Sequence, residues 1–156
     1  MRRINIVIFL SLILFAGCKK DSDYDCTPVN LTVPDSEVEA LRSYISTNAI
    51  TATEDPRGFF YNIITAGGAD KPTACDRVTV NYKGMLTNGT QFDAADNATF
   101  DYDHLIIGWQ EALPLIGSGG TITLYLPPTL GYGNTAYGDI PPNSILVFDI
   151  NLTAIE

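Results

Sequence analysis

The stretch 78–93, V-T-V-N-Y-K-G-M-L-T-N-G-T-Q-F-D, constrains the fold more than any other part of the chain. Its first residues alternate between apolar and polar up to Tyr82, and this period of two predicts a strand with one buried face. Asn88-Gly89 predicts a hairpin, because both residues tolerate a positive φ. The returning strand then places Phe92 and Asp93 near Tyr82, so we expect an aromatic ring, a phenol and a carboxylate on one face of a sheet.

Further apolar patterns indicate strands around one short helix. Strand patterns occur at 58–64, 100–102, 121–126 and 145–155, and a short helical pattern covers 108–113. Pro114 limits the backbone hydrogen bonding at the end of this helix. This order predicts an α+β fold, in which a twisted antiparallel β-sheet is wrapped around one short α-helix.

Residues 78–93 resemble the FKBP-type peptidyl-prolyl cis-trans isomerases, whose pattern is V-x-V-x-Y-x-G-x-L-x-[DN]-G-x-x-F-D. Every fixed position of that pattern is present in this sequence. The resemblance extends over residues 57–156. It implies that this part of the chain is an isomerase domain that acts on the X–Pro bonds of polypeptides and assists protein folding.

A set of residues matches the pocket positions of that family. The resemblance implies catalytic positions at Tyr82, Phe92, Asp93, Trp109, Tyr132 and Phe148, and substrate-binding positions at Phe100, Leu105, Ile106 and Ile140. Trp109 would form the floor of the pocket. Aromatic residues on strands are more often ordinary core residues, and for Phe148 or Phe100 alone that interpretation is the better one. The set as a whole favours a pocket, because an Asp among aromatic residues needs a polar partner, for which Tyr82 is one candidate.

The segment 127–143, P-P-T-L-G-Y-G-N-T-A-Y-G-D-I-P-P-N, predicts a long loop between the last two strands. Its prolines and glycines indicate a loop with a defined conformation, and it resembles the flap of the same family. One departure lies between Tyr102 and Leu105, where the chain is shorter than in the best-known members. We therefore expect the pocket wall at Leu105 and Ile106 to sit differently, with His104 at the rim or on the surface.

The resemblance implies a reaction that needs neither a nucleophile nor an acid–base pair. Resonance holds an X–Pro amide planar with a barrier of about 20 kcal/mol, and no covalent bond breaks when the amide turns. A dry aromatic pocket disfavours the planar, charge-separated amide more than the twisted one. A donor such as the Tyr132 hydroxyl could hold the carbonyl before proline. No cofactor and no metal is expected. The alternative is a binding module that holds proline-containing segments without catalysis.

Charge and composition exclude other classes of function. The net charge of −9 argues against a nucleic-acid-binding role. His104 is the only histidine, and nothing else in the sequence supports a Ser-His-Asp triad around it.

We expect a monomer whose partners are proline-containing polypeptides, and the resemblance implies that macrolide inhibitors of the family bind in the pocket.

Residues 1–17 are predicted to be a signal peptide. Arg2 and Arg3 precede an apolar run, 4–16, that is too short to span a membrane. The run ends L-F-A-G-C at Cys18, which resembles a bacterial lipobox apart from the phenylalanine at its aliphatic position. The resemblance implies lipidation of Cys18 and an anchor at the outer membrane or the cell surface. The alternative is ordinary secretory cleavage, with Cys18 incidental.

Residues 18–34 are predicted to be an acidic tether. Asp21, Asp23 and Asp25 have the spacing that starts a calcium loop, but Cys26 stands where such a loop requires glycine, so a calcium site is rejected. If Cys18 carries lipid, Cys26 and Cys75 remain as a pair in an oxidising compartment. A disulfide between them and two free thiols are both open on the sequence alone.

Residues 35–56 are predicted to form an N-terminal helix and a linker. The helical pattern runs over 36–48, where Ser36 and Glu39 have the spacing of a capping box. Val38, Leu41 and Ile45 fall on one face. A helix this short is marginal alone, so we expect it to pack against the domain that follows. Dimerisation through this helix is the alternative, without specific support.

Overall fold

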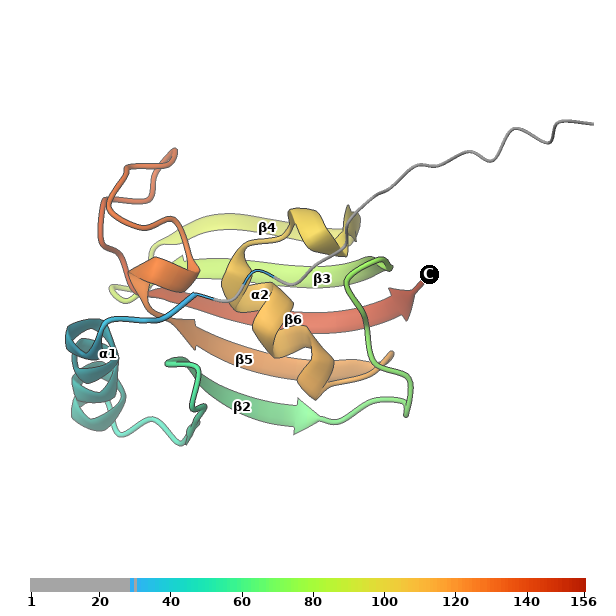
Figure 1. Ribbon diagram of the computed structural model, residues 1–156, viewed down its shortest axis with the longest axis horizontal. Coiled ribbons are helices and arrows are strands. Elements are labelled where there is room, and N and C mark those ends of the chain that lie inside the picture. Colours follow the sequence, from blue (N-terminus) through green and yellow to red (C-terminus); the bar gives the residue numbers. More distant parts are fainter. Residues whose placement is uncertain (1–28, 30) are drawn as a thin grey trace, which may run out of the picture.

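The computed structural model describes residues 29 and 31–156 and consists of one antiparallel sheet and two α-helices (Figure 1). The six-stranded sheet has the order β1-β2-β5-β6-β3-β4. Its strands are β1 (Thr53–Glu54), β2 (Phe60–Thr65), β3 (Arg77–Leu86), β4 (Gln91–Asp101), β5 (Gly120–Leu126) and β6 (Leu146–Ile155). The short helix α2 (Ile107–Ala112) lies across one face, and α1 (Asp35–Thr47) lies at one end of the sheet. The predicted α+β architecture is confirmed.

The main core lies between α2 and the sheet. On β5, buried residues alternate with partly exposed ones, as one covered face requires. Leu124 and Leu126 are fully buried and belong to the same apolar cluster as Trp109 of α2. Gly108 allows the close approach, because a Cβ at this position would lie 2.4 Å from a methyl carbon of Leu126. The sheet therefore fixes the place of Trp109.

At its end of the sheet, α1 packs against the other face of strands β2 and β5. Tyr125 lies between Leu124 and Leu126 on β5 and therefore points to the opposite face. It packs at the edge of a second cluster, in which Leu41 and Ile45 of α1 contact Phe60 of β2. The prediction that the N-terminal helix packs on the domain is confirmed. Val33, predicted to lie in the acidic tether, is also buried against the main core, so the packed chain begins before the helix.

The predicted capping box is wrong. The N-cap of α1 is Pro34, so Ser36 lies inside the helix, and Glu39 forms an ion pair with Arg42 instead of closing a box. The first turn does carry Asp35 and Glu37, whose negative charges favour a helix N-terminus. The carboxylate of Glu37 accepts hydrogen bonds from Thr129, far along the chain.

The hairpin between β3 and β4 forms where it was predicted, with a different turn. Only Gly89 has a positive φ, of 84°, while Asn88 does not. The N–H of Gly89 donates to the carbonyl of Leu86, and the Asn88 side chain accepts a bond from the N–H of Thr90. This is a three-residue loop that ends on a left-handed glycine. The Asn88 side chain thus stabilises the turn without adopting a positive φ.

Strand β4 is longer than predicted. Phe100 was assigned to a separate short strand at 100–102, whereas it belongs to the end of β4, and Tyr102 begins the 3-10 turn η1 (Tyr102–His104). The register of β4 against β3 shifts twice, between Val80 and Tyr82 and between Gly84 and Met85. Such bulges break the period of two that the prediction relied on.

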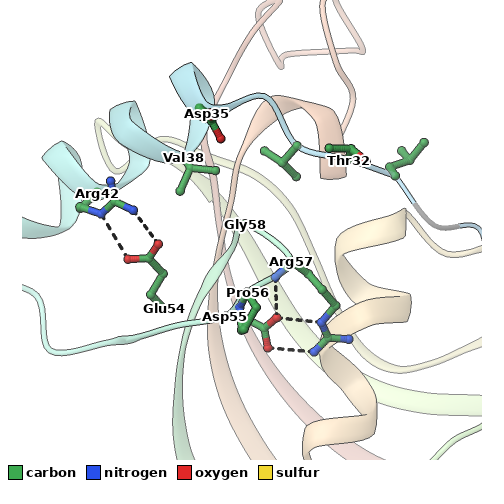
Figure 2. Close-up of a pocket in the computed structure, with 11 residues that line it drawn as sticks. Thr32, Asp35, Val38, Arg42, Glu54, Asp55, Pro56, Arg57 and Gly58 are labelled. Atoms are coloured by element: carbon green, nitrogen blue, oxygen red, sulfur yellow. Dashed lines mark hydrogen bonds and ion pairs between the residues drawn. The ribbon is translucent and has the colours of Figure 1, made fainter.

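A charged cluster joins the β1–β2 turn to α2, and Figure 2 shows its Asp55–Arg57 pair. The Arg57 guanidinium binds the Asp55 carboxylate through two bonds of 2.7 and 2.9 Å and also donates to the backbone carbonyl of Glu111. Asp55 is 8% exposed, and its bonds to Arg57 lower the pKa of its carboxyl group. Beside it is a cavity of about 500 Å³ that α1 closes on one side with Val38 and Arg42.

The predicted leader, with its lipidation residue Cys18, lies outside the described residues, as does Cys26. Cys75 is disulfide-bonded, and it is the only cysteine in the described part of the chain. The pairing of Cys75 with Cys26 therefore stays a prediction. Over residues 29 and 31–156, the helices are too short or too polar to cross a membrane.

Candidate active site

A bulge in β4 brings two consecutive side chains, Phe92 and Asp93, to the same face of the sheet. Asp93 pairs with Gly84, and Gln91 pairs with Met85, so that Phe92 is the extra residue. The Asp93 carboxylate accepts a hydrogen bond of 2.6 Å from the Tyr82 hydroxyl. The Phe92 ring lies over Gly84, where a Cβ would meet it at 2.6 Å. The predicted meeting of the ring, the phenol and the carboxylate is confirmed, although Asp93 is exposed.

Trp109 is the centre of an aromatic cluster. It is 4% exposed, and its ring stands edge-on to Tyr82, Phe148 and Phe100, with centroid separations of 5.2, 5.3 and 6.3 Å. Perpendicular contacts of this kind add to the stabilisation from burial. The indole Nε1 of Trp109 is a buried donor without a hydrogen-bond partner in the part of the chain that the structure describes.

These rings line a cavity of about 280 Å³. Its wall is formed by Tyr82, Asp93, Phe100, His104, Leu105, Ile106, Trp109, Tyr132, Tyr137 and Phe148. Of the residues predicted from the sequence, only Phe92 and Ile140 are missing from this wall. Phe92 packs behind it, perpendicular to Phe148 at 5.5 Å, and Ile140 is 4% exposed within the core cluster. Both belong to the apolar packing around the cavity without lining it.

The long loop after β5 contributes two stacked tyrosines. The rings of Tyr132 and Tyr137 lie parallel, 4.4 Å apart with an angle of 8° between their planes. Tyr137 and Ile140 exchange two backbone hydrogen bonds, of 3.0 and 2.9 Å. The loop therefore has a defined conformation, as predicted. Tyr137 is 62% exposed and was not predicted to be a site residue. The repeated Tyr-Gly pair, at 132–133 and 137–138, is the signal that could have indicated it.

The shortened segment before Leu105 is held by Gln110 of α2. The Gln110 amide donates to the carbonyl of Leu105 at 2.7 Å and to that of Asp103 at 3.2 Å. The Tyr102 hydroxyl donates to the backbone carbonyl of Gln110. Leu105 and Ile106 both line the cavity. A side chain on the helix therefore fixes this wall in place of a longer loop.

The cavity is lined mainly by apolar side chains, and its hydrogen-bond donors include the neutral hydroxyls of Tyr82 and Tyr132. Burial, followed by the bond to Asp93, raises the pKa of the Tyr82 hydroxyl, and burial raises the pKa of the Tyr132 hydroxyl. Both phenols thus keep their protons at neutral pH. His104 is an exposed rim residue, with its Nδ1 3.7 Å from a carboxylate oxygen of Asp101. Within residues 29 and 31–156, no three His, Cys, Asp or Glu side chains gather as metal ligands would.

Such a site can bind an apolar ring and hydrogen-bond a neighbouring carbonyl. The wall residues can exclude water from a bound amide, and the phenols can donate to an acceptor. Among the described lining residues, Asp93 and His104 are the polar side chains other than phenols. The Asp93 carboxylate accepts a hydrogen bond from the Tyr82 hydroxyl, and His104 is exposed. The arrangement therefore suits binding and conformational change better than bond cleavage.

Known proteins are similar to this chain in sequence and in fold. The family model for FKBP-type peptidyl-prolyl cis-trans isomerases matches residues 68–153. The FKBP-type isomerase FkpA of Aeromonas hydrophila is 36% identical over 147 residues, covering 85% of this chain and 54% of that protein. The outer membrane protein MIP of Legionella longbeachae is 42% identical over 106 residues, covering 65% of this chain and 46% of that protein.

The fold of a solved relative agrees with these matches. The crystal structure of FkpA from Escherichia coli superposes with a TM-score of 0.71 at 35% identity, covering 78% of this chain and 60% of that one. The chain spans about half the length of the curated relatives it matches. Because the family model covers more than half of the sequence and the bulged hairpin, the aromatic cavity and the loop all lie within the match, the chain belongs to the FKBP-type peptidyl-prolyl cis-trans isomerases.

Proposed function

We propose that this protein is a peptidyl-prolyl cis-trans isomerase that assists protein folding outside the cytoplasm. The observation that carries the proposal is the cavity around Trp109, which is walled by edge-on aromatic rings and opens beside Asp93 and the stacked tyrosines. Its substrates are proline-containing polypeptides. The matching family supports the reaction type, and the chain's own residues support the way in which it proceeds.

The apolar wall is the main source of catalysis. The proline ring of a substrate enters among Trp109, Phe100 and Phe148, and its amide leaves water. The planar amide is more charge-separated than the twisted one, so loss of water raises the free energy of the planar form more. Uncatalysed isomerisation takes tens of seconds; a turnover of about 10² per second is about 10⁴-fold faster, which requires about 5.5 kcal/mol.

The Tyr132 hydroxyl is the donor that we assign to the carbonyl before proline. Tyr132 lines the cavity, its ring is held by Tyr137, and its raised pKa keeps the proton in place. Holding the carbonyl fixes one half of the bond while the proline half turns. Asp93 holds the Tyr82 hydroxyl, which also lines the cavity, by a hydrogen bond of 2.6 Å.

A protease-coupled assay on a short X–Pro peptide tests the function. The parent protein should accelerate isomerisation. Tyr132→Phe should lower kcat/KM about fivefold, because one neutral hydrogen bond is worth about 1 kcal/mol. Tyr125→Phe is the matched control, because Tyr125 lies in the α1 cluster on the other face of the sheet. A folded parent protein that binds the peptide without accelerating isomerisation would support the non-catalytic binding module instead.

A family macrolide should compete for the same cavity. Calorimetric titration with rapamycin should show binding, and the bound protein should lose isomerase activity. The altered wall at Leu105 and Ile106, where Gln110 replaces a longer loop, makes affinity weaker than in members with that loop. Titration without heat and without inhibition would refute the assignment of the pocket.

The leader sequence and one relative support the proposed location outside the cytoplasm, at a membrane. The basic-apolar-small-Cys order of residues 1–18 supports lipidation of Cys18, and a relative is named as an outer membrane protein. Several acyl chains together hold a protein firmly at a membrane. After cell fractionation, Cys18→Ala should move from the membrane fraction to the soluble fraction. Retention of the variant with the membranes would refute lipid anchoring through this residue.

A further inference from the structure

Glu37 of α1 is bonded to the loop that carries Tyr132. Its carboxylate accepts hydrogen bonds from the backbone N–H of Thr129 at 2.8 Å and from the Thr129 hydroxyl at 2.9 Å. The two residues are 92 positions apart, and the contact is partly buried. Thr129 lies in the 3-10 turn η3 (Pro128–Leu130), at the start of the loop. A helix outside the family match thus contacts the base of a pocket element.

The turn η3 is connected rigidly to Tyr132. The carbonyl of Pro128 accepts bonds from Gly131 and Gly133, each at 2.9 Å, so the residues on both sides of Tyr132 are bonded to one oxygen of the turn. Leu130 is 1% exposed and belongs to the main core. A shift of η3 is therefore transmitted to the backbone on both sides of Tyr132 through two hydrogen bonds.

The N–H of Thr129 needs an acceptor from outside the turn. The first N–H groups of a helical turn have no partner within it, and proline supplies no donor at position 128. A carboxylate is the strongest acceptor that a protein offers to such a group. Glu37 provides both of its oxygens to Thr129, which fixes the turn in position and in rotation.

We propose that Glu37 is a positioning residue of the isomerase site, by which α1 holds η3 and so sets the place of Tyr132. The inference rests on the isomerase function proposed above. Other contacts hold α1 itself to the sheet: Leu41 and Ile45 pack on Phe60, and Arg42 binds Glu54 (Figure 2). Glu37 differs from them because its bonds reach the loop of the cavity.

Four proteins test the proposal: the parent, Glu37→Ala, Glu37→Gln and Asp35→Ala. Asp35 is the matched control, because it is an exposed acidic residue in the same turn of α1 (Figure 2). The X–Pro assay should show kcat/KM about tenfold lower in Glu37→Ala, as expected for a bond to a charged group. Glu37→Gln should stay near the parent, because its amide can accept from the Thr129 N–H and donate to the hydroxyl. Asp35→Ala should equal the parent.

Amide hydrogen exchange gives a second readout that does not depend on activity. The amides of Gly131 and Gly133 should exchange faster in Glu37→Ala than in the parent and in Asp35→Ala. Equal activity and equal exchange in Glu37→Ala and Asp35→Ala would overturn the proposal, as would a loss of activity in Glu37→Gln equal to that in Glu37→Ala. An inactive parent would refute the isomerase function and, with it, the role of Glu37 in that site; the exchange data would then still show whether Glu37 holds the loop.

Discussion

Removal of the Asp93 carboxylate distinguishes a desolvating pocket from acid–base chemistry. Asp93 accepts one hydrogen bond of 2.6 Å from Tyr82 and is exposed. A bond to a charged acceptor is worth about 1.5–3 kcal/mol, and exposure to solvent brings this near 1 kcal/mol. If all of that contribution is lost from the transition state, kcat/KM falls about fivefold. Asp93→Ala should therefore keep clearly measurable activity, because the wall around Trp109 remains.

The assay is the protease-coupled measurement on an X–Pro peptide, with the folded state of Asp93→Ala checked by circular dichroism. Between pH 6 and 8, kcat/KM should be nearly flat in both proteins, since the Tyr82 and Tyr132 phenols keep their protons. A general acid or base would contribute about 10²- to 10⁴-fold. Loss of activity in folded Asp93→Ala, with a bell-shaped pH profile in the parent, would refute the desolvation mechanism.

Three further predictions concern stability. Phe92→Ala should lower the free energy of unfolding by about 3 kcal/mol and reduce activity, because the ring supports Phe148 from behind; an unchanged denaturation midpoint would contradict this packing role. The carboxyl group of Asp55 has a lowered pKa in the folded state, so the ionised group stabilises the fold at neutral pH, and this stabilisation is lost as the pH falls through the folded-state pKa. Asp55→Asn should therefore be less stable than the parent at pH 7 and lose less stability on acidification, which chemical denaturation at pH 7 and at acidic pH would show. A bridge between Cys26 and Cys75 should stabilise by about 4 kcal/mol for a loop of about 50 residues, and thiol counting on the denatured, unreduced protein should then detect neither residue.

The parts of the fold that the sequence predicted well are those governed by local rules. The alternation around Tyr82 and the Asn88-Gly89 turn each depend on residues a few positions apart. The pocket residues followed from the family pattern, whereas periodicity alone does not indicate the bulge at Phe92. Had the pairing been regular, the consecutive side chains of Phe92 and Asp93 would lie on opposite faces.

The parts that were predicted wrongly depend on distant partners. Glu39 has the spacing of a capping box with Ser36, but Arg42 takes its carboxylate, and Glu37 is bonded to a residue 92 positions away. Tyr137 was missed because a loop has no period from which an inward direction can be inferred. Its direction comes from the parallel stack on Tyr132, which only the folded loop produces.

The order of the strands has a consequence for the synthesis of the chain. Strand β6, at residues 146–155, pairs with β5 on one side and β3 on the other, so it joins the two halves of the sheet. Strand β6 is translated after the other five strands of this sheet and completes its centre, so a nascent chain cannot close the sheet while residues 146–155 are still within the ribosome. Contacts between such distant segments also make folding slow.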